Sequence, residues 1–391
     1  MDFLLNQKNR DLVERARELA RDVLAPRAAD HDREGKYPRD NFLDLAREGF
    51  TTLTLPEDLG GRGLLNDPAA YGMVLYELAR GCTSTALAFH MHSGMVHVIM
   101  SLGNEEQRTR YAAAVRAGKI FASHGSEAAS SLRKKMIMDT RAMPHGDVYR
   151  VEGRKWFCSM AGGADYYVLW CQLGEEEDLS KSMCLLVTAA DAPGLILEKE
   201  WDAASMRATA SHSMRYENLE IPACDLIGKG GDPIRENLLT RFAYGYAPVY
   251  LGPGGAAFDW ALDYAQKRVL KPDNVPISTY PTTQRLIGEM KIALDGALLM
   301  IQRAGWILGA QGPKAAYSAI HEAKYAAAEA SSLITERALK VVGGPGLLRE
   351  HPLERHHRDA WAGLVMPPNS ETCLENVAKS ALPVEAGGLM T

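Results

Sequence analysis

The stretch at residues 341–359, VVGGPGLLREHPLERHHRD, holds the densest glycine cluster of the 391-residue chain. Gly343, Gly344 and Gly346 follow an Ala/Leu-rich segment, where a glycine commonly ends a helix. The cluster lacks the Lys-Ser/Thr of a P-loop and does not fit G-x-G-x-x-G after a strand. It is either a plain turn after a helix or a place where a ligand approaches the backbone closely.

Long segments with helical patterning lie before this cluster. Residues 252–268, 281–309 and 315–342 are rich in Ala and Leu, and long antiparallel helices with short connections predict a helical bundle. Residues 269–283 carry three prolines and form a longer connection between the first two helices. The bundle and the regions around it make up residues 227–391.

The first 120 residues also have helical patterning. Leu12, Ala16 and Leu19 recur at helical spacing, and Pro26 is expected to end this first helix. A second helix is expected over residues 41–48, before Gly49. A capping box at Asn104 and Gln107 is expected to start a third helix, which ends near residue 118.

Between these helical regions, residues 121–226 have the pattern of strands. Short β-rich runs at 148–158, 166–172, 182–188 and 213–221 are separated by Gly, Asp and Pro. Their alternation predicts a half-buried antiparallel sheet or barrel. The order is therefore α, then β, then α, and the junctions between such domains are preferred places for ligands.

Composition excludes several classes of protein. The net charge is −5 and no basic stripe with interleaved aromatic residues is present, so nucleic acid is not an expected partner. The most apolar stretch, residues 292–309, contains Asp295, Gln302 and Arg303, and we expect no membrane span. No secretory leader is visible. The six cysteines and the histidines form no zinc pattern, which indicates reduced thiols, no metal site and a cytoplasmic location.

Six strings, which stand in the order of the family, resemble the acyl-CoA dehydrogenase family. The turn LPEDLGG (55–61) is similar to P-E-E-x-G-G, and GRKWFCS (153–159) to N-G-x-K-x-W-I-T-N. The string SMRATAS (205–211) is similar to G-M-R-G-T-G-S. The helical strings at 85–88 and 103–107 also fit, and residues 341–359 carry the most specific match. The resemblance implies an α+β fold with an N-terminal helical domain, a central β-barrel and a C-terminal four-helix bundle.

The family binds FAD between barrel and bundle, usually as a homotetramer in which a neighbouring subunit completes the FAD site. By this resemblance Ser159 lies beside flavin N5 and can donate a hydrogen bond to the ring. Phe157 packs along the ring and Ser126 faces its pyrimidine side. Ser130 or Ser131 approaches the phosphate arm of a CoA-like ligand.

The resemblance also implies contacts with the rest of the FAD. Arg268 would reach the pyrophosphate across the subunit interface, where a planar guanidinium suits phosphate, and Gln284 matches a later family Gln. The three glycines of the cluster, Gly343, Gly344 and Gly346, would let the adenosine side approach the backbone. Asn369 and Glu371 would contact the FAD from a loop.

The catalytic carboxylate of the family is missing. A typical member has a Glu after the Arg-Asp element, and Pro367 occupies that position here. Proline cannot act as a general base. Other members place the base on a bundle helix, but residues 237–250 contain Tyr244 and Tyr246 and no carboxylate. Tyr244 is expected to contact the substrate. The remaining candidates for acid/base catalysis are His124, Glu236 and Glu371.

Three functions fit these observations. The first is oxidation of an acyl thioester, bound to CoA or to a carrier protein, at a CH–CH bond with hydride transfer to flavin N5. An electron-transfer flavoprotein or O₂ would then accept the electrons. The second is a flavin-dependent monooxygenase or oxidase on the same fold, which needs no base for an α-proton. The third is a catalytically impaired subunit of a hetero-oligomer. Fold alone does not choose among them.

Overall fold

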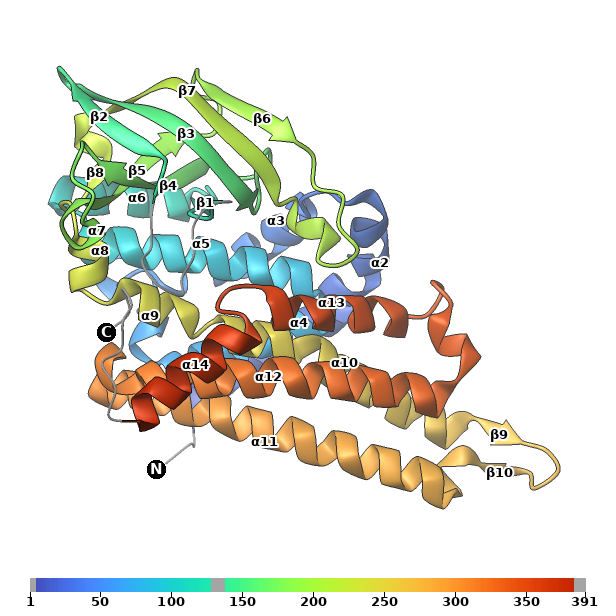
Figure 1. Ribbon diagram of the computed structural model, residues 1–391. Coiled ribbons are helices and arrows are strands. Elements are labelled where there is room, and N and C mark those ends of the chain that lie inside the picture. Colours follow the sequence, from blue (N-terminus) through green and yellow to red (C-terminus); the bar gives the residue numbers. More distant parts are fainter. Residues whose placement is uncertain (1–4, 128–137, 383–391) are drawn as a thin grey trace.

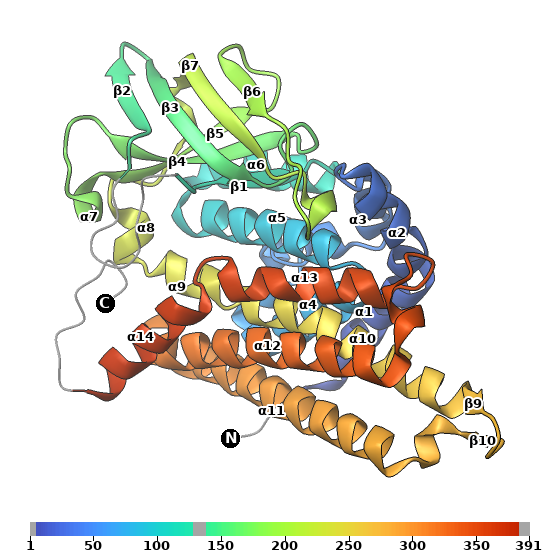
Figure 2. The ribbon, with the colours of Figure 1, turned by 45° about the vertical axis from the view of Figure 1, so that its right-hand side comes forward.

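Three layers of secondary structure make up the protein. The computed structural model describes residues 5–127 and 138–382. Figure 1 shows a β-sheet domain at the top, N-terminal helices below and beside it, and long C-terminal helices at the bottom. Figure 2 shows the same order from another side. The α, β, α order and the barrel between two helical units are confirmed.

Helices form the N-terminal layer. They are α1 (Gln7–Leu19), α2 (Ala25–Glu34), α3 (Arg39–Arg47), α4 (Pro68–Gly81), α5 (Thr83–Leu102) and α6 (Glu105–Arg116). The expected capping box is confirmed, since the Asn104 side chain accepts from the Gln107 N–H and the Gln107 side chain accepts from the Asn104 N–H. Gly49 follows α3 at φ 73°, a left-handed conformation that favours glycine.

The expectation that Pro26 ends the first helix is wrong. The chain stays helical from α1 through a π-helical turn, η1 (Ala20–Leu24), into α2. Ala25 donates its N–H to Ala20 O, five residues back, and Pro26 follows in the first turn of α2. Proline has no N–H to donate, so the start of a new α-helical segment tolerates it.

A mostly antiparallel sheet, formed by the central part of the sequence, makes up the layer at the top of Figure 1. Its order is β6-β7-β3-β2-β4-β5-β8, with β1 pairing β4 in parallel. The bounds are β1 (Phe121–His124), β2 (Arg141–His145), β3 (Val148–Cys158), β4 (Tyr166–Leu173), β5 (Met183–Ala189), β6 (Leu195–Lys199), β7 (His212–Pro222) and β8 (Leu226–Ile227). A short helix, α7 (Leu179–Ser182), precedes β5. All four expected strands are present, and β3 begins and ends at the expected residues.

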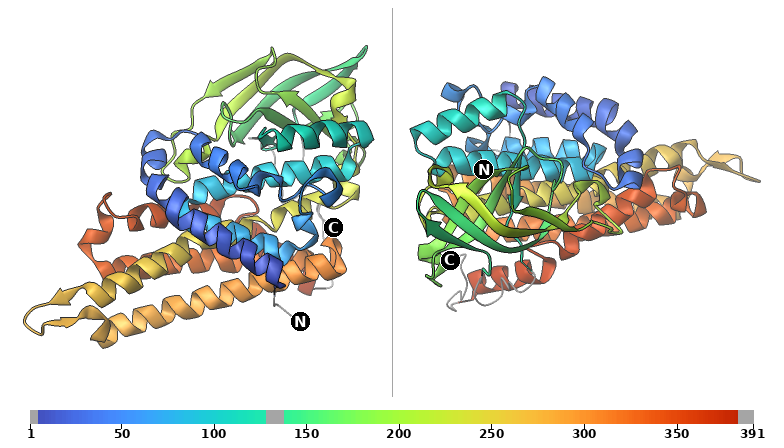
Figure 3. Two further views of the ribbon diagram at one scale, coloured as in Figure 1. Left: turned by 180° about the vertical axis from the view of Figure 1, so that it is seen from behind. Right: turned by 90° about the horizontal axis from the view of Figure 1, so that it is seen from above.

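The C-terminal layer is a bundle of long helices. Its members are α8 (Asp232–Arg235), α9 (Leu238–Ala243), α10 (Tyr246–Lys267), α11 (Pro281–Gln311), α12 (Pro313–Val342), α13 (Leu353–Val365) and α14 (Ser370–Ala381). A hairpin of β9 (Val269–Leu270) and β10 (Val275–Pro276) fills the proline-rich connection. Figure 3 shows this hairpin projecting from the end of the bundle far from the sheet.

Helix α11 leaves an apolar face uncovered. Among the described residues it is the helix that has the length and hydropathy of a membrane span, and a third of that stretch is buried. Its buried side packs on α10 and α12. Ile292 is 77% exposed and Leu299 is 54% exposed on the opposite side. The uncovered face therefore belongs to a helix that is also part of the bundle.

Candidate active site

Ser159 lies directly after β3, where the barrel meets the bundle. Its neighbours Cys158 and Met160 share one apolar core with Met206 of the following loop, Tyr250 of α10 and Ala362 of α13. The Ser159 side chain is nearly buried, at 5% exposure. A hydroxyl group at this junction is therefore shielded from bulk water and borders both domains.

A row of three hydroxyl groups begins at Ser159. Its Oγ lies 2.9 Å from Ser211 Oγ, which lies 2.7 Å from Thr209 Oγ1. Thr209 Oγ1 donates to the carbonyl oxygen of Met206 at 2.8 Å. All three side chains are buried. Sequence reasoning pointed to Ser159 but missed this row, although Thr209 and Ser211 stand in the 205–211 string.

Phe157 presents an aromatic surface beside Ser159. It has φ 55°, uncommon for a non-glycine residue, and its side chain is 51% exposed between buried Cys158 and the sheet. The rings of Phe157 and Trp201 are perpendicular to each other, with ring centres 5.8 Å apart. An uncovered aromatic face next to a shielded hydroxyl is the surface on which a planar heterocycle stacks.

The turn at residues 206–210 is fixed from the bundle. Met206 and Ala210 have φ 53° and 46°, a region that disfavours side chains with a Cβ. Asp359 of α13 accepts a hydrogen bond from the Met206 N–H at 2.7 Å. Burial raises the pKa of the Asp359 carboxyl to about 6. Next to it, Arg358 pairs with Asp32 of α2 at 2.7 Å. The Arg-Asp pair of the opening string thus ties three domains together.

Ser126 lies close to this region through its backbone. Its carbonyl accepts from the Trp156 N–H at 2.9 Å, and its side chain is exposed. The neighbouring Glu127 is buried with Lys155, and their side chains form an ion pair of 2.5 Å. The Lys155 ammonium helps to hold the pKa of Glu127 below its usual value. Ser130 and Ser131 lie outside the described residues.

The loop that contains Pro367 is held by a buried lysine. Lys324 of α12 donates to the carbonyls of Gly363 and Met366 and lies over the Tyr250 ring. Burial lowers the pKa of Lys324 to about 8. Pro367 itself is exposed. The chain after Met366 is thus anchored, and the exposed residue that follows it has no titratable side chain.

Asn369 and Glu371 follow Pro367 at the start of α14. Asn369 caps this helix, since its side-chain oxygen accepts from the Thr372 N–H at 2.8 Å. Glu371 lies exposed in the first helical turn. The structure therefore gives Asn369 a structural role and leaves the Glu371 carboxylate available to a ligand or to solvent.

A second group of candidates lies at the other end of the bundle. Arg268 ends α10 and Gln284 lies in the first turn of α11, on either side of the hairpin. The glycine cluster follows α12, which runs back toward that end, as the Arg337–Glu289 ion pair of 2.8 Å shows. Within one chain, Figure 1 places this group away from β3.

Three acid/base or substrate candidates lie where they cannot serve as expected. His124 is fully buried in the barrel, with Nδ1 3.0 Å from the Tyr216 hydroxyl, and burial lowers its pKa to about 3. Tyr244 is fully buried in the bundle and donates to Ile301 O. Glu236 is exposed beside α8, a helix that packs on α7 and β5 rather than on the 206–210 turn. We therefore retain none of the three as a site residue.

The bundle tyrosines are also unsuited to act as a general base. Burial raises the pKa of Tyr244, Tyr246 and Tyr250. On α5, His90 bonds to Tyr71 and to Phe242 O, and His92 bonds to Thr51 O. Both histidines are therefore buried packing residues of α5.

The residues at the barrel junction fit a flavin. The donor set offers a shielded hydroxyl at Ser159 and an uncovered ring at Phe157, which suit a polar ring nitrogen and a planar ring system. In the second group, a Cβ added at Gly343 or Gly344 would meet nothing within 4 Å, so the backbone there is open to approach. Arg268 adds a guanidinium for phosphate.

Comparison with known sequences identifies the class. Sequence models of the acyl-CoA dehydrogenase N-terminal, middle and C-terminal domains match residues 6–119, 119–219 and 228–382. The chain belongs to the acyl-CoA dehydrogenase family. It is 30% identical to the short-chain specific acyl-CoA dehydrogenase of Bos taurus, over 91% of this chain and 85% of the bovine one.

Solved structures share the fold along nearly the whole chain. The FAD complex of PigA superimposes with a TM-score of 0.86 at 20% identity and covers 97% of this chain and 99% of its own. The prolyl acyl carrier protein oxidase AnaB gives 0.85 at 22% identity and covers 97% and 100%. The fold expected from the resemblance is confirmed.

Proposed function

We propose that this protein is an FAD-dependent oxidoreductase that oxidises an acyl thioester bound to CoA or to a carrier protein. The shielded Ser159 hydroxyl beside the uncovered Phe157 ring carries the proposal. Similarity to the bovine acyl-CoA dehydrogenase supports a CoA ester, and similarity to AnaB supports a carrier-bound one. When bound, FAD supplies a hydride acceptor at N5. An electron-transfer flavoprotein or O₂ would take up the electrons.

The residues of the chain would divide the remaining work. Ser126, Phe157 and Ser159 would hold and orient the ring, with Asn369 or Glu371 at the opposite side. The Asp359–Met206 bond would keep the 206–210 turn in place. Pro367 cannot remove an α-proton, so the substrate would carry a more acidic carbon or use another base, for which the exposed Glu371 carboxylate remains a candidate.

The exposed Pro367 also favours a second function, a flavin-dependent monooxygenase or oxidase, because such chemistry requires no base at that position. An anaerobic titration separates the two. The purified yellow protein receives a panel of acyl-CoAs while the flavin absorbance is followed. Bleaching supports acyl oxidation. No bleaching, with reductant-dependent O₂ uptake and a hydroxylated product, supports the monooxygenase. Neither response, with tight binding to a related chain, supports an impaired subunit.

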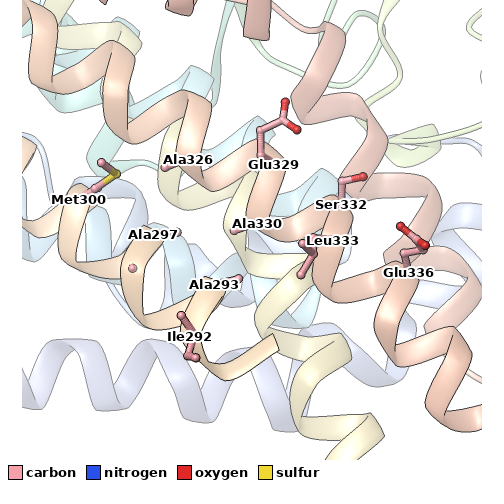
Figure 4. Close-up of a pocket in the computed structure, with 11 residues that line it drawn as sticks. Ile292, Ala293, Ala297, Met300, Ala326, Glu329, Ala330, Ser332, Leu333 and Glu336 are labelled. Carbon is pink, nitrogen blue, oxygen red and sulfur yellow. The ribbon is translucent and has the colours of Figure 1, made fainter. Parts of the chain in front are cut away.

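We further propose a homo-oligomer, either a dimer or a tetramer. Figure 4 shows the groove between α11 and α12, lined by Ile292, Met300 and Leu333 together with two glutamates. Apolar surface of this kind commonly packs on a partner. An oligomer would also let Arg268 and the glycine cluster of one subunit reach the flavin of another. Analytical ultracentrifugation tests this proposal, and a monomer at micromolar concentration would refute it.

A further inference from the structure

Three aromatic rings form a row along α9 and α10. Phe242, Tyr246 and Tyr250 are spaced four residues apart, which places their side chains on one side of this helical segment. The ring centres of Phe242 and Tyr246 are 5.6 Å apart, and those of Tyr246 and Tyr250 are 6.1 Å apart. Tyr250 is fully buried, whereas Phe242 and Tyr246 are partly exposed. This aromatic row therefore leaves part of two rings uncovered.

The Tyr250 end of the aromatic row lies beside the proposed flavin site. A Cβ added at Gly363 of α13 would lie 2.9 Å from Tyr250 Cβ. Asp359, one helical turn before Gly363, accepts from the Met206 N–H. Helix α5 packs both on the short helical turn Arg207–Thr209 and on α10. The aromatic row thus begins where α13 and α5 border the 206–210 turn.

His90 of α5 closes the other end of the aromatic row. Its ring stacks on Phe242 with ring centres 4.7 Å apart, and its centre lies 5.2 Å from that of Tyr246. The imidazole donates from Nε2 to the Phe242 carbonyl and accepts at Nδ1 from the Tyr71 hydroxyl, both at 2.9 Å. Two hydrogen bonds therefore hold the ring that ends the row.

The space between α5 and this end of the aromatic row is filled. A Cβ added at Gly94 of α5 would overlap the Phe242 ring, and one added at Gly245 would overlap the His90 ring. Protein interiors are close-packed, and here only glycine leaves room for the two rings. A hydrocarbon chain therefore cannot pass between α5 and α9 unless one of these rings moves.

We infer that the aromatic row and His90 restrict the substrate to thioesters of short acyl groups. The inference rests on the proposed function and names its substrate class. An acyl group that leaves the flavin site along the uncovered surfaces of Tyr246 and Phe242 is bound there by the hydrophobic effect. It meets the His90–Phe242 stack after a short distance, because the rings of the row are in contact with one another.

Binding of two acyl groups tests this limit without requiring turnover. Butyryl and octanoyl thioesters, each offered on CoA and on 4′-phosphopantetheine, are titrated into the FAD-bound protein by calorimetry. The wild type should bind the butyryl ester at least about tenfold more tightly, because extra methylene groups do not fit a filled space. In an open apolar pocket each added methylene group would instead strengthen binding about fourfold.

Phe242→Ala removes the ring on which His90 stacks. The ratio of octanoyl to butyryl affinity should rise about 15-fold, the effect of burying two further methylene groups. Phe258→Ala is the matched control, since Phe258 is a buried phenylalanine of α10 in the separate core of the bundle. It should leave the ratio unchanged. Phe242→Leu, a smaller change, should move the ratio in the same direction as Phe242→Ala.

The outcomes separate the inference from the proposed function. Preference for the butyryl ester in the wild type, lost in F242A and kept in F258A, supports the inference. Octanoyl binding as tight as butyryl binding in the wild type overturns it while the thioester assignment stands. An unchanged ratio in F242A, or an equal rise in F258A, also overturns it. Should F242A not fold, the ratio in F242L decides. A wild type that contains FAD and binds neither acyl group on either carrier refutes the proposed thioester substrate, and with it the inference.

Discussion

Asp359 and Met206 are joined by a 2.7 Å hydrogen bond across 153 residues of chain, from the backbone N–H of the turn to a carboxylate of the bundle. The bond fixes the residue whose carbonyl ends the hydroxyl row. Its acceptor is fully enclosed, and burial raises the pKa of Asp359 to about 6. The same carboxyl group therefore holds the 206–210 turn in place, and its burial costs free energy when it is ionised.

Replacing Asp359 separates these two effects. In D359A the Met206 N–H loses its buried acceptor, and we expect a loss of about 1–3 kcal/mol of unfolding free energy. D359N keeps an oxygen acceptor and should lose less. Urea denaturation at pH 7 measures both. Equal losses in the two variants would show that the hydrogen bond to Met206 is not what the carboxylate supplies.

The raised pKa of Asp359 also has a pH signature. Between its unfolded value near 4 and about 6, the folded state binds more protons than the unfolded state, so this residue stabilises less as pH rises. Relative to D359N, the wild type should gain about 1 kcal/mol on going from pH 7 to pH 5. A constant difference would contradict the burial of the carboxyl group.

Buried histidines act in the opposite direction. Burial lowers the pKa of five fully or nearly fully buried imidazoles to about 3 or 4, those of His90, His92, His124, His321 and His356. Below pH 6.5 they take up protons in the unfolded state first, so stability falls as pH drops from 6.5 toward 4. Each imidazole lowers the unfolding free energy by roughly 2 kcal/mol between pH 7 and pH 5, which exceeds the stabilisation gained from Asp359 over the same range.

We therefore expect the protein to unfold cooperatively near pH 5. His124→Gln should reduce the loss between pH 7 and pH 5 by about 2 kcal/mol, because one imidazole no longer titrates. It should leave the pH profile of turnover unchanged, since His124 lies inside the barrel. A shifted turnover profile in H124Q would restore His124 as an acid/base candidate.

Lys324 offers a prediction at alkaline pH. Burial lowers its pKa to about 8, so between 8 and its unfolded value near 10.5 the unfolded state binds more protons. The contribution of Lys324 to stability therefore rises with pH across this window. The difference in unfolding free energy between wild type and K324M should increase by about 2 kcal/mol from pH 8 to pH 10.

The same substitution probes the Pro367 loop. K324M removes the donor to the Gly363 and Met366 carbonyls, so the loop should loosen and the protein should bind FAD more weakly. K340M is the control, since Lys340 lies exposed on the same helix and pairs with Glu336. Equal FAD affinity in wild type, K324M and K340M would show that the loop does not contact the cofactor.

Local patterns were enough to predict most of the fold. The alternation of apolar and polar residues predicted where β3 begins and ends, and the capping box predicted where α6 begins. Pro26 was misjudged because a π-helical turn depends on the tertiary context of the helix. The burial of Lys155 could have been predicted, because Lys155 stands four residues after Val151 on β3 and both side chains are buried. Its partner could not be deduced, because Glu127 meets it only once the sheet has formed.

The site was only partly predictable for the same reason. The family strings pointed to Ser159, Phe157 and Ser126. The fold brings Ser126 close to the other two, because its carbonyl accepts from the Trp156 N–H. The strings could not reveal that the Asp359 of one string binds the Met206 of another, or that Lys324 holds the loop before Pro367. Such contacts join residues on separate domains. Pairings over such distances are set by packing, which no local pattern encodes.

Placing a carboxylate at position 367 tests how the Pro367 loop faces the substrate. The chain before this position is anchored by Lys324 through the Met366 carbonyl, so a side chain at 367 starts from a fixed backbone. A positioned general base commonly contributes ~10² to 10⁴-fold in rate. Pro367→Glu should therefore raise the rate of anaerobic flavin bleaching by an acyl-CoA by at least about 100-fold. Pro367→Gln, whose side chain is similar in size to glutamate but has no titratable group, should not raise this rate.

If P367E and P367Q bleach equally slowly while both bind FAD and acyl-CoA, position 367 does not face the α-carbon. The oxidation would then depend on a base elsewhere, or the protein would carry out the O₂-dependent chemistry instead.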